Sequence, residues 1–293
     1  MVHFTFAFLL FTFAFLLGVS MQAPNQQQSP QLLPGVKHII AVSSGKGGVG
    51  KTTVSVNLAI SLAKAGASVG LLDADIYGPN VPLMMGLNQQ PDVHDDEKII
   101  PLEAHGVRFM SLGVITDANT PIIWRGPIVG KVIQQFMMDV HWGELDYLVV
   151  DLPPGTGDAQ LTLSQTVPLS GAVIVTTPQN VALEDVHRGI EMFRKVNVPL
   201  LGIVENMSYF LCPCCGDKTP LFGDGGGTRV ADAFSLPLLG QIPIQPEIRI
   251  GGDEGQPISL GDNEPARSFA DVAKKLKEML GESAQAAPTI TIS

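Results

Sequence analysis

The stretch of this chain best suited to chemistry is GKGGVGKT, which runs from Gly45 to Thr52 between an apolar strand-like run and an amphipathic helix-like run. Glycines in this pattern let successive backbone N–H groups curl around a phosphate that side chains would block. Lys51 supplies a charge for the outer phosphates, Thr52 supplies a hydroxyl ligand for Mg²⁺, and a helix beginning near Gly50 directs its positive end at the anion. A nucleoside triphosphate is therefore the predicted ligand. The predicted loop contacts are Gly45, Gly47, Gly48, Val49, Gly50, Lys51 and Thr52.

Acidic residues at predicted strand ends complete this site. Asp73 and Asp75 follow a strand in LLDADIYGPN, and their alternate positions place both near its carboxyl end, where one can order water and the other metal. Asp151 ends the apolar run LDYLVVD, as expected of a Walker B carboxylate that holds Mg²⁺ directly or through water, although a capping aspartate would also fit. Gly155 in PPGTGD is expected to contact the γ-phosphate and act as a switch. Asn206 is a candidate for adenine recognition and equally a turn residue.

All three cysteines, Cys212, Cys214 and Cys215, lie within four consecutive residues, so they cannot form a disulfide framework across a fold. Cys212 and Cys215 form a C-x-x-C pair in a loop rich in Pro and Gly. Two thiolates provide half of the four ligands that a structural zinc or an iron-sulfur cluster usually takes. A twofold dimer would supply the other half. A shared zinc, a redox disulfide and inert thiols are the alternatives.

The elements that must position these residues alternate along the chain. This order predicts a doubly wound α/β fold, with a mostly parallel sheet of about seven strands and helices on both faces, whose ligands lie at the carboxyl ends of the strands. The predicted strands are Lys37–Ser43, Ser68–Asp73, Val107–Leu112, Tyr147–Asp151, Ala172–Thr177, Leu200–Glu205 and Leu238–Ile242. The predicted helices are Thr53–Lys64, Pro127–Val140, Val181–Val196 and Pro265–Leu280.

Composition limits the function classes. The chain has 293 residues, 45% of them hydrophobic, which is typical of a globular protein rather than a disordered one. A net charge of -10 argues against a partner that is a nucleic acid, since that would need clustered Lys and Arg. We expect an apolar leader at 1–21, a polar linker at 22–36, the P-loop domain at 37–281 and a flexible tail at 282–293.

The leader raises the question of localisation. Residues 4–17 form an apolar run that is short for a membrane span but suits a signal-peptide core, except that no Lys or Arg precedes it. Clustered thiols and a nucleotide site favour the reducing cell interior. We therefore expect a cytoplasmic protein, with membrane contact only if the segment 4–17 is retained.

From Gly35 to Leu280 the chain resembles the Mrp/ApbC-type P-loop iron-sulfur carriers and their mitochondrial relative of complex I assembly. The motifs that carry this resemblance are GVKHIIAVSSGKGGVGKTT, LLDADIYGPNVP, WRGP, DYLVVDLPPGTGD, TPQNVALEDV, ENMSYFLCPCCG and GQIPI. The resemblance implies a homodimeric ATPase that holds a labile 4Fe-4S cluster on Cys212 and Cys215 of both subunits. It also implies transfer of the cluster to apoproteins and exchange with cluster-donor scaffold proteins. Two departures are the apolar leader in place of a small N-terminal domain, and Cys214 in a spacer position.

The same resemblance assigns further roles, through the MinD, ParA and nitrogenase-iron-protein superfamily. Lys46 corresponds to the deviant Walker A lysine, which reaches the nucleotide of a partner subunit. Asp75 would position the attacking water, Asp73 would support the metal region, and Thr53 would lie near the α-phosphate. The implied catalytic set is Lys46, Lys51 and Asp75.

Two other functions remain open from the sequence. A positioning ATPase of the MinD/ParA kind would attach to a membrane or DNA, and a zinc-stapled scaffold would bind nucleotide without turnover. The last predicted helix carries Lys274, Lys275 and Lys277, which would allow membrane binding in the first case. Its apolar stripe more simply docks on the sheet, and consists of Phe269, Val272, Leu276 and Met279.

Overall fold

The structure is a computed structural model of the chain, and it describes residues 33, 35–75, 78–94, 98–114 and 126–285. The predicted leader at 1–21, the linker up to residue 32 and the end of the tail, 286–293, lie outside the described residues. The described part belongs to one compact unit, which is assigned to Leu32–Ser293.

An eight-stranded sheet organises this unit, in the spatial order β10-β7-β6-β1-β5-β2-β4-β3. Neighbouring strands are parallel except at the β3–β4 edge, which is antiparallel. Its strands are β1 (Val36–Ser44), β2 (Val69–Asp73), β3 (Leu102–Ala104), β4 (Val107–Ser111), β5 (Leu145–Asp151), β6 (Gly171–Thr176), β7 (Leu200–Glu205) and β10 (Leu238–Gln241). The mostly parallel sheet is confirmed. The predicted strand number was one too low, because β3 is a three-residue edge strand with too few residues to show a periodic pattern.

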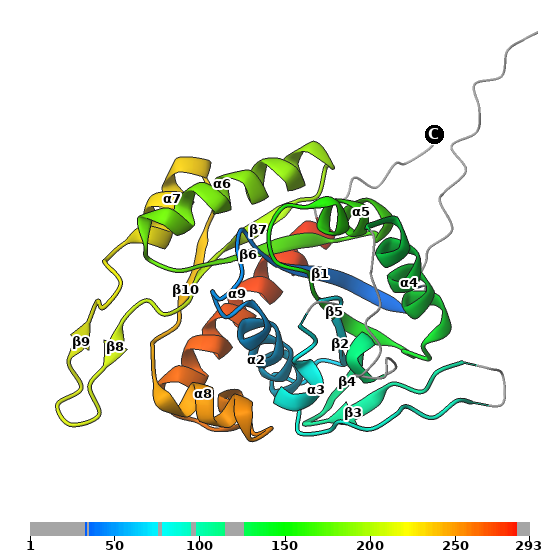
Figure 1. Ribbon diagram of the computed structural model, residues 1–293. Coiled ribbons are helices and arrows are strands. Elements are labelled where there is room, and N and C mark those ends of the chain that lie inside the picture. The colour runs from blue at the N-terminus through cyan, green and yellow to red at the C-terminus, as the bar shows by residue number, and fades with distance from the viewer. Residues whose placement is uncertain (1–32, 34, 76–77, 95–97, 115–125, 286–293) are drawn as a thin grey trace, which may run out of the picture. The chain divides into compact units, whose positions relative to one another are not determined.

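Helices cover both faces of the sheet. The described helices are α2 (Lys51–Lys64), α3 (Val81–Met84), α4 (Gly126–Asp139), α5 (Asp158–Thr166), α6 (Asn180–Lys195), α7 (Gly226–Phe234), α8 (Pro246–Asp253) and α9 (Glu264–Gln285). Figure 1 shows α2 and α9 on one face, and α4, α5, α6 and α7 on the other. Short 3-10 turns lie at Leu112–Val114 and Ile258–Leu260, and a small hairpin is formed by β8 (Phe210–Leu211) and β9 (Lys218–Thr219).

The four long predicted helices correspond to α2, α4, α6 and α9. Sequence periodicity missed α3, α5, α7 and α8. Two of these, α7 and α8, each contain a pair of adjacent glycines, which lowers intrinsic helix propensity. Their helical form depends on what they pack against, so that a local pattern did not reveal them.

The strand order places the first strand in the middle of the sheet. β1 pairs with β5 on one side and β6 on the other, and all three are apolar runs buried on both faces, as central parallel strands are. The chain moves from β1 toward β2 in one direction, and from β5 across β1 to β6 in the other. This reversal opens a crevice at the carboxyl ends of β1 and β5, where doubly wound folds bind ligands.

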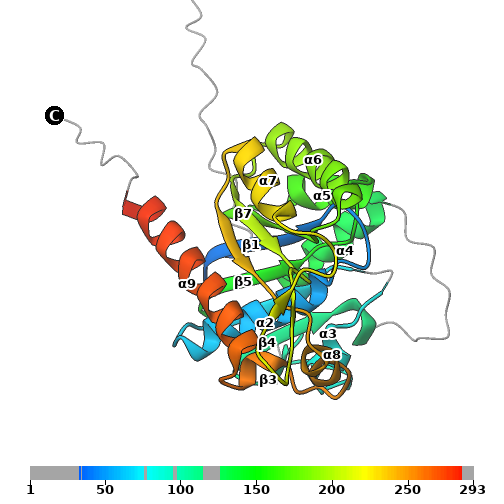
Figure 2. The same cartoon turned by 90° about the vertical axis from the view of Figure 1, so that its left-hand side faces the viewer.

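Helix α9 docks on the sheet and on α2. Figure 2 shows α9 running diagonally past the sheet, with its C-terminal end projecting beyond it. Phe269, Val272 and Leu276 have no exposed surface, and Met279 packs against the same core. A Cβ on Gly240 of β10 would lie 2.5 Å from Val272 Cγ2, so the helix and the strand are in close contact. The apolar stripe is thus a docking face rather than a membrane face. Of the helices in the described ranges, none has the length and hydropathy to cross a bilayer.

We predict that Phe269→Ala lowers the free energy of unfolding by about 3–5 kcal/mol, because it removes a fully buried aromatic ring between α9 and the sheet. Urea unfolding followed by circular dichroism measures this. The control, Lys274→Ala on the exposed side of α9, should change the unfolding free energy by less than about 0.5 kcal/mol. Equal effects of the two substitutions would contradict the docking of α9.

Candidate functional site

The loop between β1 and α2 has the backbone shape of a phosphate cradle. Gly48 and Gly50 have φ of 79° and 78°, a left-handed conformation that favours glycine. Space is also short, since a Cβ on Gly50 would lie 2.2 Å from Asn206 Nδ2, and one on Gly45 would lie 2.4 Å from the Asp185 carbonyl carbon. α2 begins at Lys51 without a side-chain cap, so its first N–H groups are available to an anion.

Asp151 is the centre of a buried polar cluster. Its carboxylate is fully buried at the end of β5, and its Oδ1 lies 2.8 Å from Lys51 Nζ. Thr52 Oγ1 donates to Asp151 Oδ2 at 2.7 Å, and Ser55 Oγ donates to Oδ1 at 2.6 Å. The first turn of α2 is thereby tied to the end of β5. Ser55 was missed from the sequence, although its position one turn after Lys51 is the signal that would have found it.

Asp73 and Asp75 lie on different sides of this cluster. Asp73 is opposite Asp151 in the β2–β5 register, and it accepts hydrogen bonds from Ser111 Oγ at 2.9 Å, Asp75 N at 3.1 Å and Val81 N at 3.3 Å. Burial, and then the charge of Asp151, raise the pKa of Asp73 to about 8. Asp75 instead lines the open cavity, with its Oδ2 3.5 Å from Lys51 Nζ.

A cavity of about 770 Å³ lies above the phosphate cradle, a size that accommodates a small-molecule ligand. Its polar lining contains the predicted residues Lys46, Gly47, Gly48, Gly50, Lys51, Thr52, Thr53, Asp75 and Asn206. Its apolar lining includes Leu83 of α3, Ile248 of α8, and Leu221 and Phe222 beyond the small hairpin. Leu221 is 55% exposed and Phe222 41% exposed. The fold therefore collects the loop, Asp75 and Asn206 around one space.

Two groups that are predicted to contact the nucleotide already form hydrogen bonds within the chain. The N–H of Gly155, whose φ is 89°, donates to the carbonyl of Ser44 at 3.0 Å. Asn206 is buried beside the loop, and its Nδ2 donates to the carbonyl of Val49 at 2.8 Å. A γ-phosphate contact by Gly155 would replace its bond to Ser44. Asn206 lines the cavity while holding the phosphate loop in shape.

The cysteines lie in the turn of the β8–β9 hairpin, which projects away from the sheet in Figure 1. The N–H of Cys212 donates to the Asp217 carbonyl at 3.0 Å, and Gly216 N donates to the Cys212 carbonyl at 2.9 Å. N–H groups of Cys215 and then Cys214 donate to the Cys212 sulfur and lower its pKa. A lowered pKa favours the thiolate, which is the form of cysteine that binds metals.

The three thiols differ in their exposure. Cys214 and Cys215 are exposed, and Cys212 is half-buried. Within the ranges that the structure describes, no group of three or more His, Cys, Asp or Glu side chains is arranged to hold a metal ion.

The sequence matches a known family model. A sequence model of the ParA group, described as the NUBPL iron-transfer P-loop NTPase, matches residues 35–277. The chain belongs to this family. The identity to an iron-sulfur cluster carrier protein of Aquifex aeolicus is 51% over 252 residues, 85% of this chain and 69% of that one. An Arabidopsis thaliana protein named iron-sulfur protein required for NADH dehydrogenase, mitochondrial, is also 51% identical over 85% of this chain and 81% of its own length. Mouse iron-sulfur cluster transfer protein NUBPL is 46% identical over 92% of this chain and 88% of its own length.

Solved structures agree on the fold. A nucleotide-binding protein of Archaeoglobus fulgidus in complex with ADP is 41% identical, with a TM-score of 0.68, over 76% of this chain and 88% of that one. The cell division ATPase MinD of Pyrococcus furiosus gives a TM-score of 0.61 at 24% identity, over 83% of this chain and 99% of that one. At this identity the likeness is evidence for the fold alone. The expected MinD/ParA-type architecture is confirmed.

We predict that the metal-free wild type loses stability relative to Asp73→Asn as the pH rises from about 4 to about 8. An ordinary carboxyl has a pKa of about 4, so a folded-state pKa of about 8 means that folding favours the protonated form. The stability that this proton contributes is complete below about pH 4 and is lost as the pH passes about 8. Urea unfolding at several pH values measures it. Parallel pH profiles of the two proteins would contradict the prediction, and Asp271→Asn, on the exposed side of α9, is the control.

Proposed function

We propose that this protein binds and hydrolyses ATP and carries a labile 4Fe-4S cluster between two subunits for transfer to apoproteins. The observation that carries the proposal is the path of residues 206–225, the thiol segment, between β7 and α7. The segment lines the nucleotide cavity at Asn206 and Met207, continues into the C-x-x-C hairpin, and returns to the cavity at Leu221 and Phe222. The names of the relatives support the same cargo.

Charge supports a divalent cation beside the nucleotide. Two carboxylates, Asp75 and Asp151, lie within 3.5 Å of one buried ammonium, Lys51, and Asp73 lies beside Asp151 with a raised pKa. A triphosphate adds negative charge to this region, which Lys51 and the loop N–H groups balance only in part. Thr52 Oγ1, on the cavity, and Asp151 Oδ2, 2.7 Å behind it, are hard oxygen donors that fit Mg²⁺. Bound there, Mg²⁺ would neutralise charge on the β- and γ-phosphates.

The residues of the chain would then divide the work of hydrolysis. Lys51 leaves Asp151 for the outer phosphates, and Asp75, on the cavity wall, orients a water for in-line attack on the γ-phosphate. Thr53 lies beside the α-phosphate, and Asn206 contacts the base. Lys46, half-exposed at the edge of the loop, reaches the nucleotide of the partner subunit. Gly155 exchanges its bond to Ser44 for the γ-phosphate, so it reports whether the triphosphate is intact.

The cluster is cargo rather than a resident cofactor. Two hairpins related by a twofold axis would provide four thiolates, Cys212 and Cys215 from each subunit. We propose that the homodimer receives the cluster from donor scaffolds in the cytoplasm, takes no nucleic-acid partner, and contacts membranes only if the segment 4–17 is retained. Exposure of the hairpin suits a cargo that must be handed to another protein.

Lys51→Ala is predicted to lower the rate of ATP hydrolysis about 100-fold or more, because it removes the charge aimed at the transferred phosphate. Phosphate release measures turnover, and circular dichroism checks the fold. Lys131→Ala, exposed on α4, is the matched control and should leave turnover unchanged. Turnover that persists in Lys51→Ala would show that hydrolysis occurs elsewhere.

Anaerobic reconstitution is predicted to load the wild type with iron and sulfide in equal amounts, and to fail for Cys212→Ala and Cys215→Ala. Cys214→Ala should load as the wild type does, and it provides the matched control. Metal analysis and size-exclusion chromatography measure loading and dimerisation. Zinc without iron in all loaded samples would favour the zinc-stapled scaffold, whereas equal iron in every variant would remove these thiols as ligands.

A further inference from the structure

A buried carboxylate, Glu205, lies at the end of β7, where the thiol segment begins. It has no exposed surface. Ser208 Oγ donates to Glu205 Oε1 at 2.5 Å, Gln241 Nε2 of β10 donates to the same oxygen at 2.8 Å, and the N–H of Gly227 donates to Oε2. These donors are all neutral. Because Gly227 lies in the first turn of α7, the positive end of the helix dipole also points at the carboxylate and stabilises its charge.

These contacts hold together the two ends of the thiol segment. Ser208 lies where the chain leaves the sheet, and Gly227 lies in the first turn of α7, where the chain returns. A Cβ on Gly227 would lie 2.8 Å from Glu205 Cβ, and one on Gly226 would lie 2.4 Å from the Pro178 carbonyl oxygen. The glycines allow this close approach. One carboxylate therefore joins the outgoing chain, the returning helix and β10.

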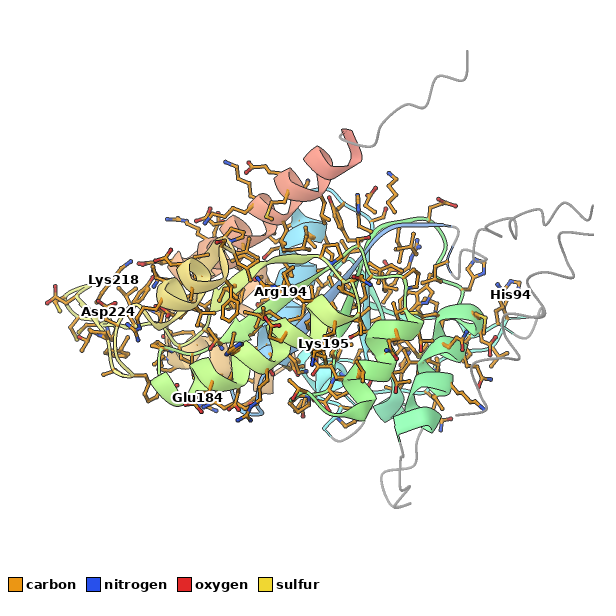
Figure 3. All side chains as sticks on the ribbon, turned by 90° about the horizontal axis from the view of Figure 1, so that it is seen from above. His94, Glu184, Arg194, Lys195, Lys218 and Asp224 are labelled. Carbon is orange, nitrogen blue, oxygen red and sulfur yellow. The ribbon has the colours of Figure 1, made fainter. Side chains whose placement is uncertain are left out.

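The nucleotide cavity touches the thiol segment both at its root and in its outer part. Asn206 Nδ2 bonds to the Val49 carbonyl of the phosphate loop, while Leu221 and Phe222 form cavity wall. In Figure 3, Lys218 and Asp224, on either side of Leu221 and Phe222 in the chain, lie together at one edge of the view. The cavity wall and the thiols thus belong to one continuous stretch of chain whose root is fixed.

The outer part of the hairpin has a weaker attachment. Lys218 Nζ lies 3.2 Å from Glu264 at the start of α9 and 4.4 Å from the centre of the Tyr209 ring. Lys218 and Glu264 are 58% and 44% exposed, and exposed pairs of this kind contribute little to stability. The contacts of Lys218 at the tip are therefore weaker than the buried hydrogen bonds at the root.

We propose that Glu205 is a positioning residue that couples the nucleotide cavity to the thiols. Glu205 fixes the root of the thiol segment. When nucleotide displaces Leu221 and Phe222, the β8–β9 hairpin that carries the thiols therefore moves with them. Without Glu205, the same displacement separates Ser208 from Gly227 at the root. The exposure of the thiols then no longer changes when nucleotide binds. The inference rests on the proposed function for the meaning of this coupling, but the coupling itself is a property of the metal-free chain.

The test is the rate at which N-ethylmaleimide labels Cys212 and Cys215 in the reduced, metal-free protein, read by peptide mass spectrometry. Rates are compared without nucleotide, with Mg²⁺ and ADP, and with Mg²⁺ and a non-hydrolysable ATP analogue. In the wild type we expect the analogue to change the labelling rate about fivefold or more. In Glu205→Gln, whose amide offers one acceptor oxygen to three donors, we expect the nucleotide Kd to be kept and the change in labelling rate to be lost.

Matched variants keep the test decisive. Ser208→Ala removes one bond at the outgoing end and should weaken the response even if Glu205→Gln fails to fold. Glu191→Gln, an exposed carboxylate on α6, should respond as the wild type does. A wild type that binds nucleotide without a change in labelling, or a Glu205→Gln or Ser208→Ala variant that responds fully, would overturn the inference. Failure to bind nucleotide at all would instead overturn the proposed function, and failure to load a cluster would leave the coupling result standing.

Discussion

The ion pair between Lys51 and Asp151 is the interaction on which the nucleotide site depends. Both side chains are buried, and a buried charge is tolerated only when it is paired and hydrogen-bonded. The pair joins the first residue of α2 to the last residue of β5, which fixes the phosphate loop between them. Thr52 and Ser55 reinforce the same junction by donating to Asp151.

This pair also explains why the site suits a nucleotide bound with a divalent cation. Lys51 serves Asp151 and Asp75, while Asp73 lies next to Asp151 across the sheet and has a raised pKa. A phosphate that draws Lys51 away leaves Asp151 without its ammonium partner. A cation beside Thr52 would restore the balance. This charge balance supports the proposal that nucleotide and a divalent cation bind together.

A second carboxylate repeats this arrangement without a cation. Glu205 ends β7 as Asp151 ends β5, but it binds neutral donors from Ser208, Gln241 and α7. The phosphate loop and the root of the thiol segment thus both lie at the carboxyl ends of the strands. In the proposed carrier, exposed thiols at the tip and a fixed root would allow release of the cluster to another protein in response to nucleotide.

The sequence by itself determined the phosphate loop, the carboxylates at strand ends and the thiol pair, because each is a local pattern of a few consecutive residues. It determined the parallel sheet through the alternation of strands and helices along the chain. Tertiary structure decided which groups meet. Ser55 contacts Asp151 across 96 positions of the chain, and Ser111 contacts Asp73 across 38, so no local pattern joins them. It also decided that Asp75 rather than Asp73 faces the cavity, and that glycine-rich α7 is helical. Such outcomes depend on packing and desolvation between distant segments, which only the assembled fold brings together.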